Sequence, residues 1–150
     1  MPISIELKPL SFVLQRPGFE AWCQEYVEEL SNPFLPEPGA QIENWEAWEK
    51  EGRLRCVAVL DGDVLAGLII LLVSRSGHYP YPVIGLDSFY LRKPWRRGRT
   101  GLDLWGAAKA VVKREGAPGF CVMAPPGSKL EKLCELKGMP FTHKAFWCAV

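Results

Sequence analysis

Leu86-Asp-Ser-Phe-Tyr-Leu-Arg-Lys-Pro-Trp-Arg-Arg-Gly-Arg-Thr-Gly101 is the stretch of sequence that decides the fold. An apolar strand pattern runs into a loop rich in arginine and glycine, and a helix is expected to begin at about Thr100. A helix N-terminus leaves backbone N–H groups unpaired, and glycines at 98 and 101 let a ligand approach them. Five cations surround this point: Arg92, Lys93, Arg96, Arg97 and Arg99. The stretch predicts a phosphate or pyrophosphate site, with a solvated basic loop as the alternative.

The rest of the composition is that of an ordinary globular protein. A chain of 150 residues fits one domain, 1–150, with a sizeable core, and its formal net charge is only +1. Positive charge is therefore local, which favours a small anionic ligand over nucleic acid. The longest apolar run, 64–73, is too short to span a bilayer, so no membrane partner is expected.

Cysteine usage points to a reducing compartment. The five cysteines include no Cys-x-x-Cys pair, and with two histidines they form no zinc spacing, so no metal is expected. Buried free thiols are the simplest interpretation. With no secretory leader pattern, the expected location is the cytoplasm.

Hydrophobic periodicity predicts ten elements in one α/β domain. Strands are expected at 3–9, 53–60, 64–73, 83–91, 119–123 and 141–149, and helices at 19–30, 41–51, 100–115 and 128–138. Asp61-Gly62 between two apolar runs predicts a hairpin. The run 64–73 lacks alternation, which is typical of a strand buried on both faces.

This order, with a phosphate loop between the fourth strand and the third helix, resembles the GNAT acetyltransferase superfamily, in its compact phage or bacterial form. The family's loop signature is Arg/Gln-x-x-Gly-x-Gly/Ala, and the matching residues here are Arg96-Arg97-Gly98-Arg99-Thr100-Gly101. Arg99 stands where the middle glycine usually does. Leu133-Cys-Glu-Leu-Lys-Gly-Met139 resembles the family's Leu-Tyr-x-x-x-Gly-Phe helix end. The resemblance implies a mixed, mostly antiparallel sheet of about six strands with four helices.

The resemblance also implies acetyl-CoA as cofactor and direct transfer of its acetyl group, in a ternary complex, to a primary amine on a protein or small molecule. Residues expected to contact acetyl-CoA lie at the end of the fourth strand, in the loop and at the start of the last helix. They are Phe89, Tyr90, Leu91, Arg96, Arg97, Gly98, Arg99, Thr100, Gly101 and Ser128. Ser128 is equally well explained as a helix N-cap.

Two residues are candidates for proton transfer. Asp87, where family members often carry a carboxylate, is the candidate base, and in a strand without a bulge it shares a face with Phe89 and Leu91. Its alternative is a structural aspartate bonded to the turn at 77–82. Cys134 stands at the position where the family often has a tyrosine that acts as general acid, so it is the candidate proton donor. Its alternative role is helix packing.

The acceptor side is expected between the first two helices. Phe34, Trp45 and Trp48, beside several glutamates, suit a cationic amine, although both tryptophans could instead pack the short helix onto the sheet. The departures at Arg99 and Cys134 leave an alternative function open. In it, a catalytically impaired GNAT-fold protein binds or inhibits a partner macromolecule. A homodimer is a further option, and acetylation of aminoacyl-tRNA is disfavoured by the net charge.

Overall fold

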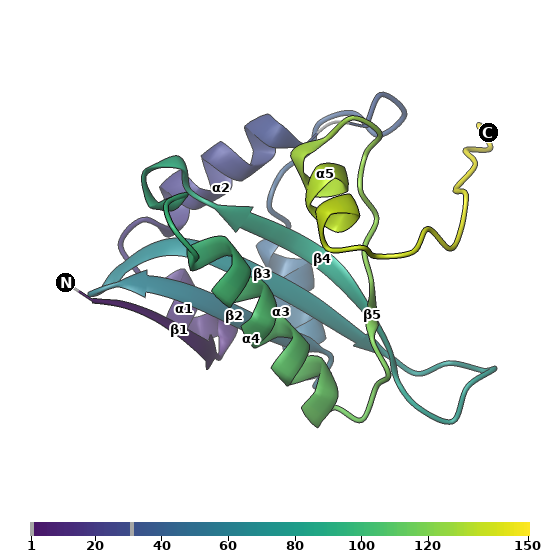
Figure 1. The fold of residues 1–150 in the computed structure, drawn as a ribbon, viewed down its shortest axis with the longest axis horizontal. Helices are drawn as coiled ribbons and strands as arrows, with labels where there is room; N and C mark the ends of the chain where they lie inside the picture. The colour runs from purple at the N-terminus through teal and green to yellow at the C-terminus, as the bar shows by residue number, and fades with distance from the viewer. Residues whose placement is uncertain (1, 31) are drawn as a thin grey trace.

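A computed structural model describes residues 2–30 and 32–150 of the chain. Five strands form one sheet in the order β1-β2-β3-β4-β5 (Figure 1). The first four are antiparallel neighbours, and β5 runs parallel to β4. The strands are β1 (Ile3–Lys8), β2 (Leu54–Asp61), β3 (Val64–Ser74), β4 (Val83–Leu91) and β5 (Phe120–Cys121).

Helices cover both faces of this sheet. The helices are α1 (Leu10–Leu14), α2 (Phe19–Glu29), α3 (Ile42–Lys50), α4 (Thr100–Arg114) and α5 (Lys129–Leu136), with a short 3-10 turn at Lys93–Trp95. Buried side chains of α1, α2 and α3 pack on one face, and those of α4 pack on the other. No helix of the described part of the chain has the length and apolar character needed to cross a bilayer.

The central strands form as the sequence predicts. Asp61 pairs with Val64 across a two-residue turn, and Gly62 has φ 61°, a left-handed conformation that glycine adopts without strain. Residues 65–71 of β3 are buried, so both faces of this strand are covered. The predicted mixed α/β class is confirmed, and so is the predicted order of elements up to α5 apart from the added helix α1.

The predicted strand 141–149 is wrong, because residues 141–150 form no regular structure. β5 is only two residues long, so it offers too short a ladder for another strand. Phe141 and Trp147, which share a face in the predicted strand, are 78% and 52% exposed. Phe34 stacks on Trp147, but no strand of the described sheet pairs with this segment. The described part of the chain therefore has five strands rather than six.

The sequence patterns also missed α1, so residues 2–30 and 32–150 contain five α-helices instead of four. α1 follows directly on Pro9, and it inserts Leu10 and Val13 into the core, both fully buried. A helix of five residues is too short to show a hydrophobic period, so only its packing reveals it.

Candidate active site

A β-bulge at Asp87 interrupts β4. Ser88 pairs with Ile70 of β3, whereas the next residue of β3, Leu71, pairs with Leu86. Asp87 is therefore the extra residue, and strand alternation changes phase there.

The phase change decides which face the candidate base occupies. Phe89 and Leu91 pack with the α4 core, but the Asp87 carboxylate contacts Trp45 of α3 on the opposite face. The expectation that Asp87 shares a face with Phe89 and Leu91 is thus corrected. A bulge has no reliable sequence signal here, which is why the periodic pattern assigned the wrong face.

Four side chains meet at the bulge. Oδ2 of Asp87 accepts from Trp45 Nε1 at 3.2 Å and from Ser88 Oγ at 2.9 Å. The Tyr26 hydroxyl donates to the main-chain oxygen of Asp87 at 3.4 Å. Burial raises the pKa of Tyr26, so its phenol stays neutral at physiological pH. Among the described residues, no hydrogen bond joins the Asp87 side chain to the turn at 77–82.

Two of these four residues, Tyr26 and Ser88, were not among the sequence candidates. Tyr26 lies within the predicted helix 19–30, where nothing in the sequence marks it as functional, and Ser88 is a small polar residue inside a strand. Tyr26 lies 61 positions away from the bulge, so only the packing of α2 on β4 brings the two together.

β4 has β3 on one side and β5 on the other, but β5 pairs with it only at 84 and 85. The rest of that second edge, from 86 to 91, has no strand partner in the described structure. The N–H of Arg92 donates to Ala66 O, which makes these two a hydrogen-bonded pair of the β3–β4 ladder. Bonded and non-bonded pairs alternate, so the N–H and C=O groups of Phe89 and Leu91 point away from β3. The C=O of Leu91 already accepts from Arg96 Nε at 2.6 Å, so this edge offers an extended ligand the N–H and C=O of Phe89 and the N–H of Leu91.

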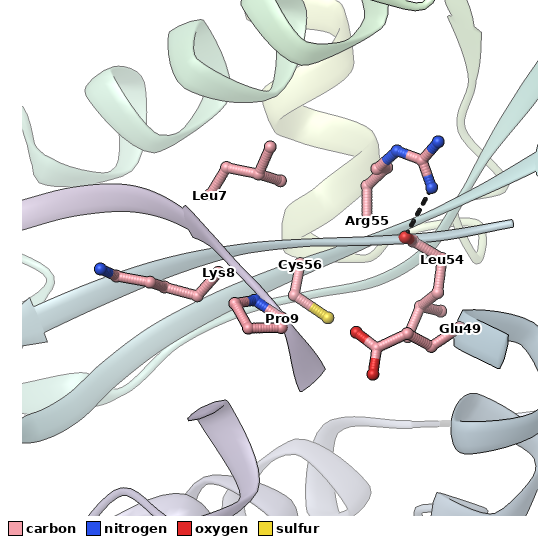
Figure 2. Close-up of a pocket in the computed structure, with 7 residues that line it drawn as sticks. All are labelled: Leu7, Lys8, Pro9, Glu49, Leu54, Arg55 and Cys56. Atoms are coloured by element: carbon pink, nitrogen blue, oxygen red, sulfur yellow. Dashed lines mark hydrogen bonds between the residues drawn. The ribbon is translucent and has the colours of Figure 1, made fainter. Parts of the chain in front are cut away.

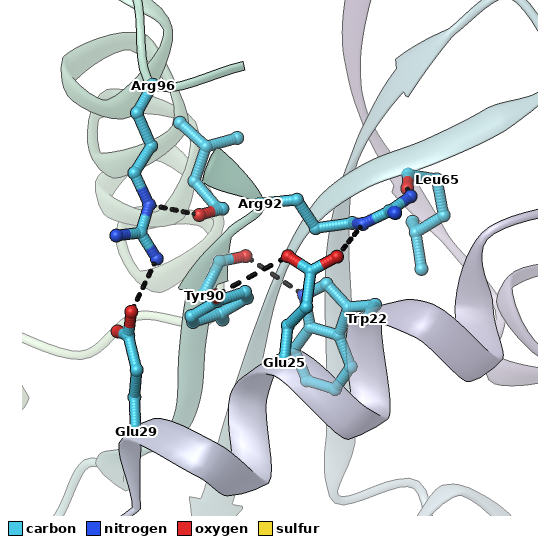
Figure 3. Close-up of polar contacts among 8 residues, drawn as sticks. Trp22, Glu25, Glu29, Leu65, Tyr90, Arg92 and Arg96 are labelled. Atoms are coloured by element: carbon cyan, nitrogen blue, oxygen red, sulfur yellow. Dashed lines mark hydrogen bonds and ion pairs between the residues drawn. The ribbon is translucent and has the colours of Figure 1, made fainter. Parts of the chain in front are cut away.

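The open edge leads to the basic loop, where two arginines are already paired. Arg92 Nε lies 2.9 Å from Glu25 Oε1, and Arg96 NH2 lies 3.0 Å from Glu29 Oε1 (Figure 3). Both acids belong to α2. The expectation that all five cations surround one ligand is therefore too simple, since these two tie the loop to α2.

The remaining loop groups fit an anion. Gly98 has φ 57°, and no backbone carbonyl of the described residues accepts from the N–H groups of Gly98, Arg99 or Gly101. Arg97 is exposed and takes part in no described ion pair, and the Arg99 side chain is 78% exposed, with a long contact of 3.7 Å to Asp103. These donors, at the end of the open edge, suit the diphosphate of CoA.

The Arg92–Glu25 pair predicts a stability effect. Its side chains are only 15% and 27% exposed, so we expect Glu25→Gln to lower the free energy of unfolding by about 1–3 kcal/mol. The more exposed Arg96–Glu29 pair makes Glu29→Gln the matched comparison, with an expected loss below about 1 kcal/mol. Urea unfolding of the three proteins measures both. Equal losses would show that burial does not set the strength of these pairs.

The other predicted residues lie apart from the bulge. Phe34 is 59% exposed and stacks on Trp147, with ring centroids 5.9 Å apart. Trp48 packs partly buried against the core cluster under α3. Cys134 is half-buried in α5, and burial raises its pKa. Ser128 is the N-cap of α5, accepting from Glu131 N–H at 3.1 Å.

Two cavities of the described structure contain none of the predicted site residues. The first, about 300 Å³, lies between the end of β1, the start of β2 and Glu49 of α3 (Figure 2). The second, about 530 Å³, lies between α4 and the residues that follow α5. The candidate site is therefore an open strand edge and loop rather than one of these hollows.

The cysteines give a prediction that depends on pH. Burial raises the pKa of Cys56 to about 12 and that of Cys23 to about 11, whereas Cys121 and Cys148 are exposed. At pH 8 we expect Cys121 and Cys148 to react first with a thiol reagent, and Cys56 only after unfolding. Thiol counts with and without urea test this, and rapid native labelling of Cys56 would contradict it.

The same thiols affect stability at high pH. An unfolded cysteine thiol has a pKa near 9.0, whereas burial raises the pKa of Cys56 in the folded protein to about 12. The stability that these protonated thiols contribute is complete below pH 9 and is lost as the pH rises toward 12.

Solved structures with this fold are known, at low sequence identity. Aminoglycoside N-acetyltransferase AAC(6')-Iy in complex with CoA superposes with a TM-score of 0.75 at 12% identity, over 99% of this chain and 95% of that one. A ribosomal-protein-alanine N-acetyltransferase from Brucella melitensis biovar Abortus 2308 gives 0.74 at 12% identity, over all of both chains. The aminoglycoside acetyltransferase meta-AAC0020 from an uncultured soil metagenomic sample, with sisomicin, gives 0.72 at 15%, over 99% and 96%.

A comparison with curated protein sequences found no match. The model of the acetyltransferase (GNAT) family, in contrast, matches residues 19–127, which is more than half of the chain. The matched region contains α2, the Asp87 bulge, the open edge of β4 and the basic loop. The chain therefore belongs to the GNAT acetyltransferase family and is an acetyl-CoA-dependent N-acetyltransferase, as the sequence resemblance implied.

Proposed function

We propose that this chain acetylates a small polyamine, with CoA held along the open edge of β4 and Asp87 acting as general base. The observation that carries the proposal is the place of the bulge. Gly85 is the last residue of β4 that pairs with β5, and Asp87 lies two residues later. Asp87 is therefore placed where the open edge begins. The basic loop lies at the other end of that edge. The diphosphate of CoA would therefore bind at one end of the edge, and the acetyl transfer would take place at the other.

The chain's own groups divide the work. The backbone N–H and C=O of Phe89 and the N–H of Leu91 bind the pantetheine arm, and the free N–H groups of the loop bind the diphosphate. Acetyl-CoA supplies a thioester carbonyl that an amine can attack. Asp87 accepts the proton that the amine nitrogen loses as the C–N bond forms and the C–S bond breaks. Cys134, whose raised pKa keeps it protonated, is the candidate donor to the departing thiolate.

A cationic acceptor is favoured by exposed acids on the two helices that contact Asp87 and on the loop between them. Asp87 is exposed, and so is a set of acids on α2, α3 and the connecting loop that takes part in no described ion pair: Glu28, Glu37, Glu43 and Glu46. Phe34 of that loop is apart from the bulge and stacks on Trp147 with one face, and its exposed ring can attract ammonium groups. Polyamines present several such groups at once, and the aminoglycoside acetyltransferases named above share the fold.

The cofactor site is tested by thermal unfolding with acetyl-CoA. A ligand at about 100 times its Kd adds about 2.7 kcal/mol of stability, so Tm should rise with concentration. Gly98→Val should weaken this shift strongly, because a β-branched residue fits poorly at φ 57° and displaces the loop N–H groups.

Gly52→Val is the matched control for this substitution. Gly52 has φ 74°, and no atom lies within 4 Å of an added Cβ, as at Gly98, but it lies in the turn before β2. This variant should be less stable yet keep the acetyl-CoA shift. No shift in the unsubstituted protein would overturn the cofactor site, and an equal shift in Gly98→Val would overturn the role of the loop.

A further inference from the structure

The Asp87 carboxylate is held by one oxygen only. Both side-chain donors, Trp45 Nε1 and Ser88 Oγ, bond to Oδ2, and no group of the described residues bonds to Oδ1. Asp87 itself is exposed. One carboxylate oxygen is thus fixed from inside the protein, and the other can reach a ligand from solvent.

The two donor residues, Trp45 and Ser88, are buried, whereas the carboxylate of Asp87 that they hold is exposed. Trp45 is 4% exposed and packs edge-on against Trp22, with ring centroids 6.4 Å apart. Ser88 is 2% exposed and lies in the ladder opposite Ile70. Buried donors with defined geometry restrict rotation of the carboxylate, which would otherwise turn freely about its last bond.

We infer that Trp45 and Ser88 are positioning residues that aim Oδ1 of Asp87 at the acceptor nitrogen. This inference rests on the proposed function, in which Asp87 is the base. The sequence predicted that Trp45 contacts the acceptor amine. Because Trp45 is only 4% exposed, we infer that it acts on the amine through Asp87 instead.

The titratable groups next to Asp87 keep the same charge near pH 7. The titratable groups that face it are Tyr26 from α2 and Cys56 from β2. Burial raises the pKa of both, that of Cys56 to about 12, so both stay neutral near pH 7. No described ion pair includes Asp87. A change in rate near pH 7 would therefore report on the carboxylate and its two donors.

The test is amine-dependent thiol release from acetyl-CoA between pH 5 and 9. Trp45→Phe removes the indole N–H and keeps an aromatic ring. We expect kcat to fall by about 10- to 100-fold, with little change in KM for acetyl-CoA. Ser88→Ala removes the second donor to Oδ2 and should lower kcat in the same direction.

A double-mutant cycle separates positioning from general damage. If Trp45 acts through Asp87, Trp45→Phe should lower kcat by less than about 3-fold when Asp87 is already Asn. Trp105→Phe is the packing control, since Trp105 is also 4% exposed but lies on the α4 face. It should leave kcat nearly unchanged. An equal fall of kcat in Trp45→Phe and Trp105→Phe, or additive losses in the cycle, would overturn the inference.

A second measurement does not need turnover. Proton exchange of the Trp45 indole N–H, followed by NMR, should be slow in the unsubstituted protein and faster in Asp87→Ala, with melting curves confirming that the variant folds. Equal exchange rates would mean that the bond to Oδ2 is absent and would overturn the inference. Full turnover by Asp87→Asn, in contrast, would overturn the proposed base while leaving the indole bond measurable.

Discussion

Asp87→Asn is expected to lower kcat for amine acetylation by about 10²- to 10⁴-fold, the range that general bases contribute. Asparagine has nearly the same shape, and its amide oxygen can still accept from Trp45 and Ser88. What it cannot do is take a proton from the acceptor. Steady-state thiol release over a range of pH measures the loss, and the acetyl-CoA shift in Tm should persist.

Asp61→Asn is the control for this substitution. Asp61 also accepts an indole N–H on Oδ2, from Trp95 at 3.0 Å, and it is half-buried in the hairpin region. This variant should keep most of its turnover. If both variants lose activity equally, the effect belongs to the loss of any such aspartate, and Asp87 has no special role.

Trp22→Ala is expected to cause the largest loss of stability, about 3–5 kcal/mol of unfolding free energy. Trp22 is fully buried, and its ring stacks on Tyr26 at 5.0 Å between centroids. Its indole N–H donates to Tyr90 O at 3.0 Å, so it also fixes the end of β4. Alanine would leave a cavity between α2 and the sheet and remove this bond.

Urea unfolding measures this effect against two comparisons. Trp22→Phe keeps most of the ring volume and should lose clearly less. Trp147→Ala removes a tryptophan that is 52% exposed, and its loss should stay below about 1 kcal/mol. A Trp22→Ala protein no less stable than Trp147→Ala would contradict the core described here.

Local signals in the sequence were sufficient for much of the fold. The hairpin at Asp61-Gly62 and the uninterrupted apolar run of β3 depend on neighbouring residues, and both were predicted correctly. The strand at 141–149 depended instead on a distant partner. Its alternation was present, but β5 offers only two residues for pairing, so no ladder forms.

The same distinction applies to the candidate site. The loop at 96–101 could be identified from its glycines, its arginines and the helix that follows. The orientation of Arg92 and Arg96 could not, because it depends on two acids of α2 that lie 67 positions earlier. The face of Asp87 depends on a single extra residue in β4, which changes the phase of the strand without changing its apolar pattern.

The central claim is that this chain transfers acetyl groups to amines at the open edge of β4. Its most direct test is thiol release from acetyl-CoA with three acceptors: an aminoglycoside such as sisomicin, a linear polyamine, and a peptide with an N-terminal alanine. We expect saturable release that needs an amine and is faster with the aminoglycoside and the linear polyamine than with the peptide. Asp87→Asn should nearly abolish it. Release that is the same with and without every amine would contradict the claim.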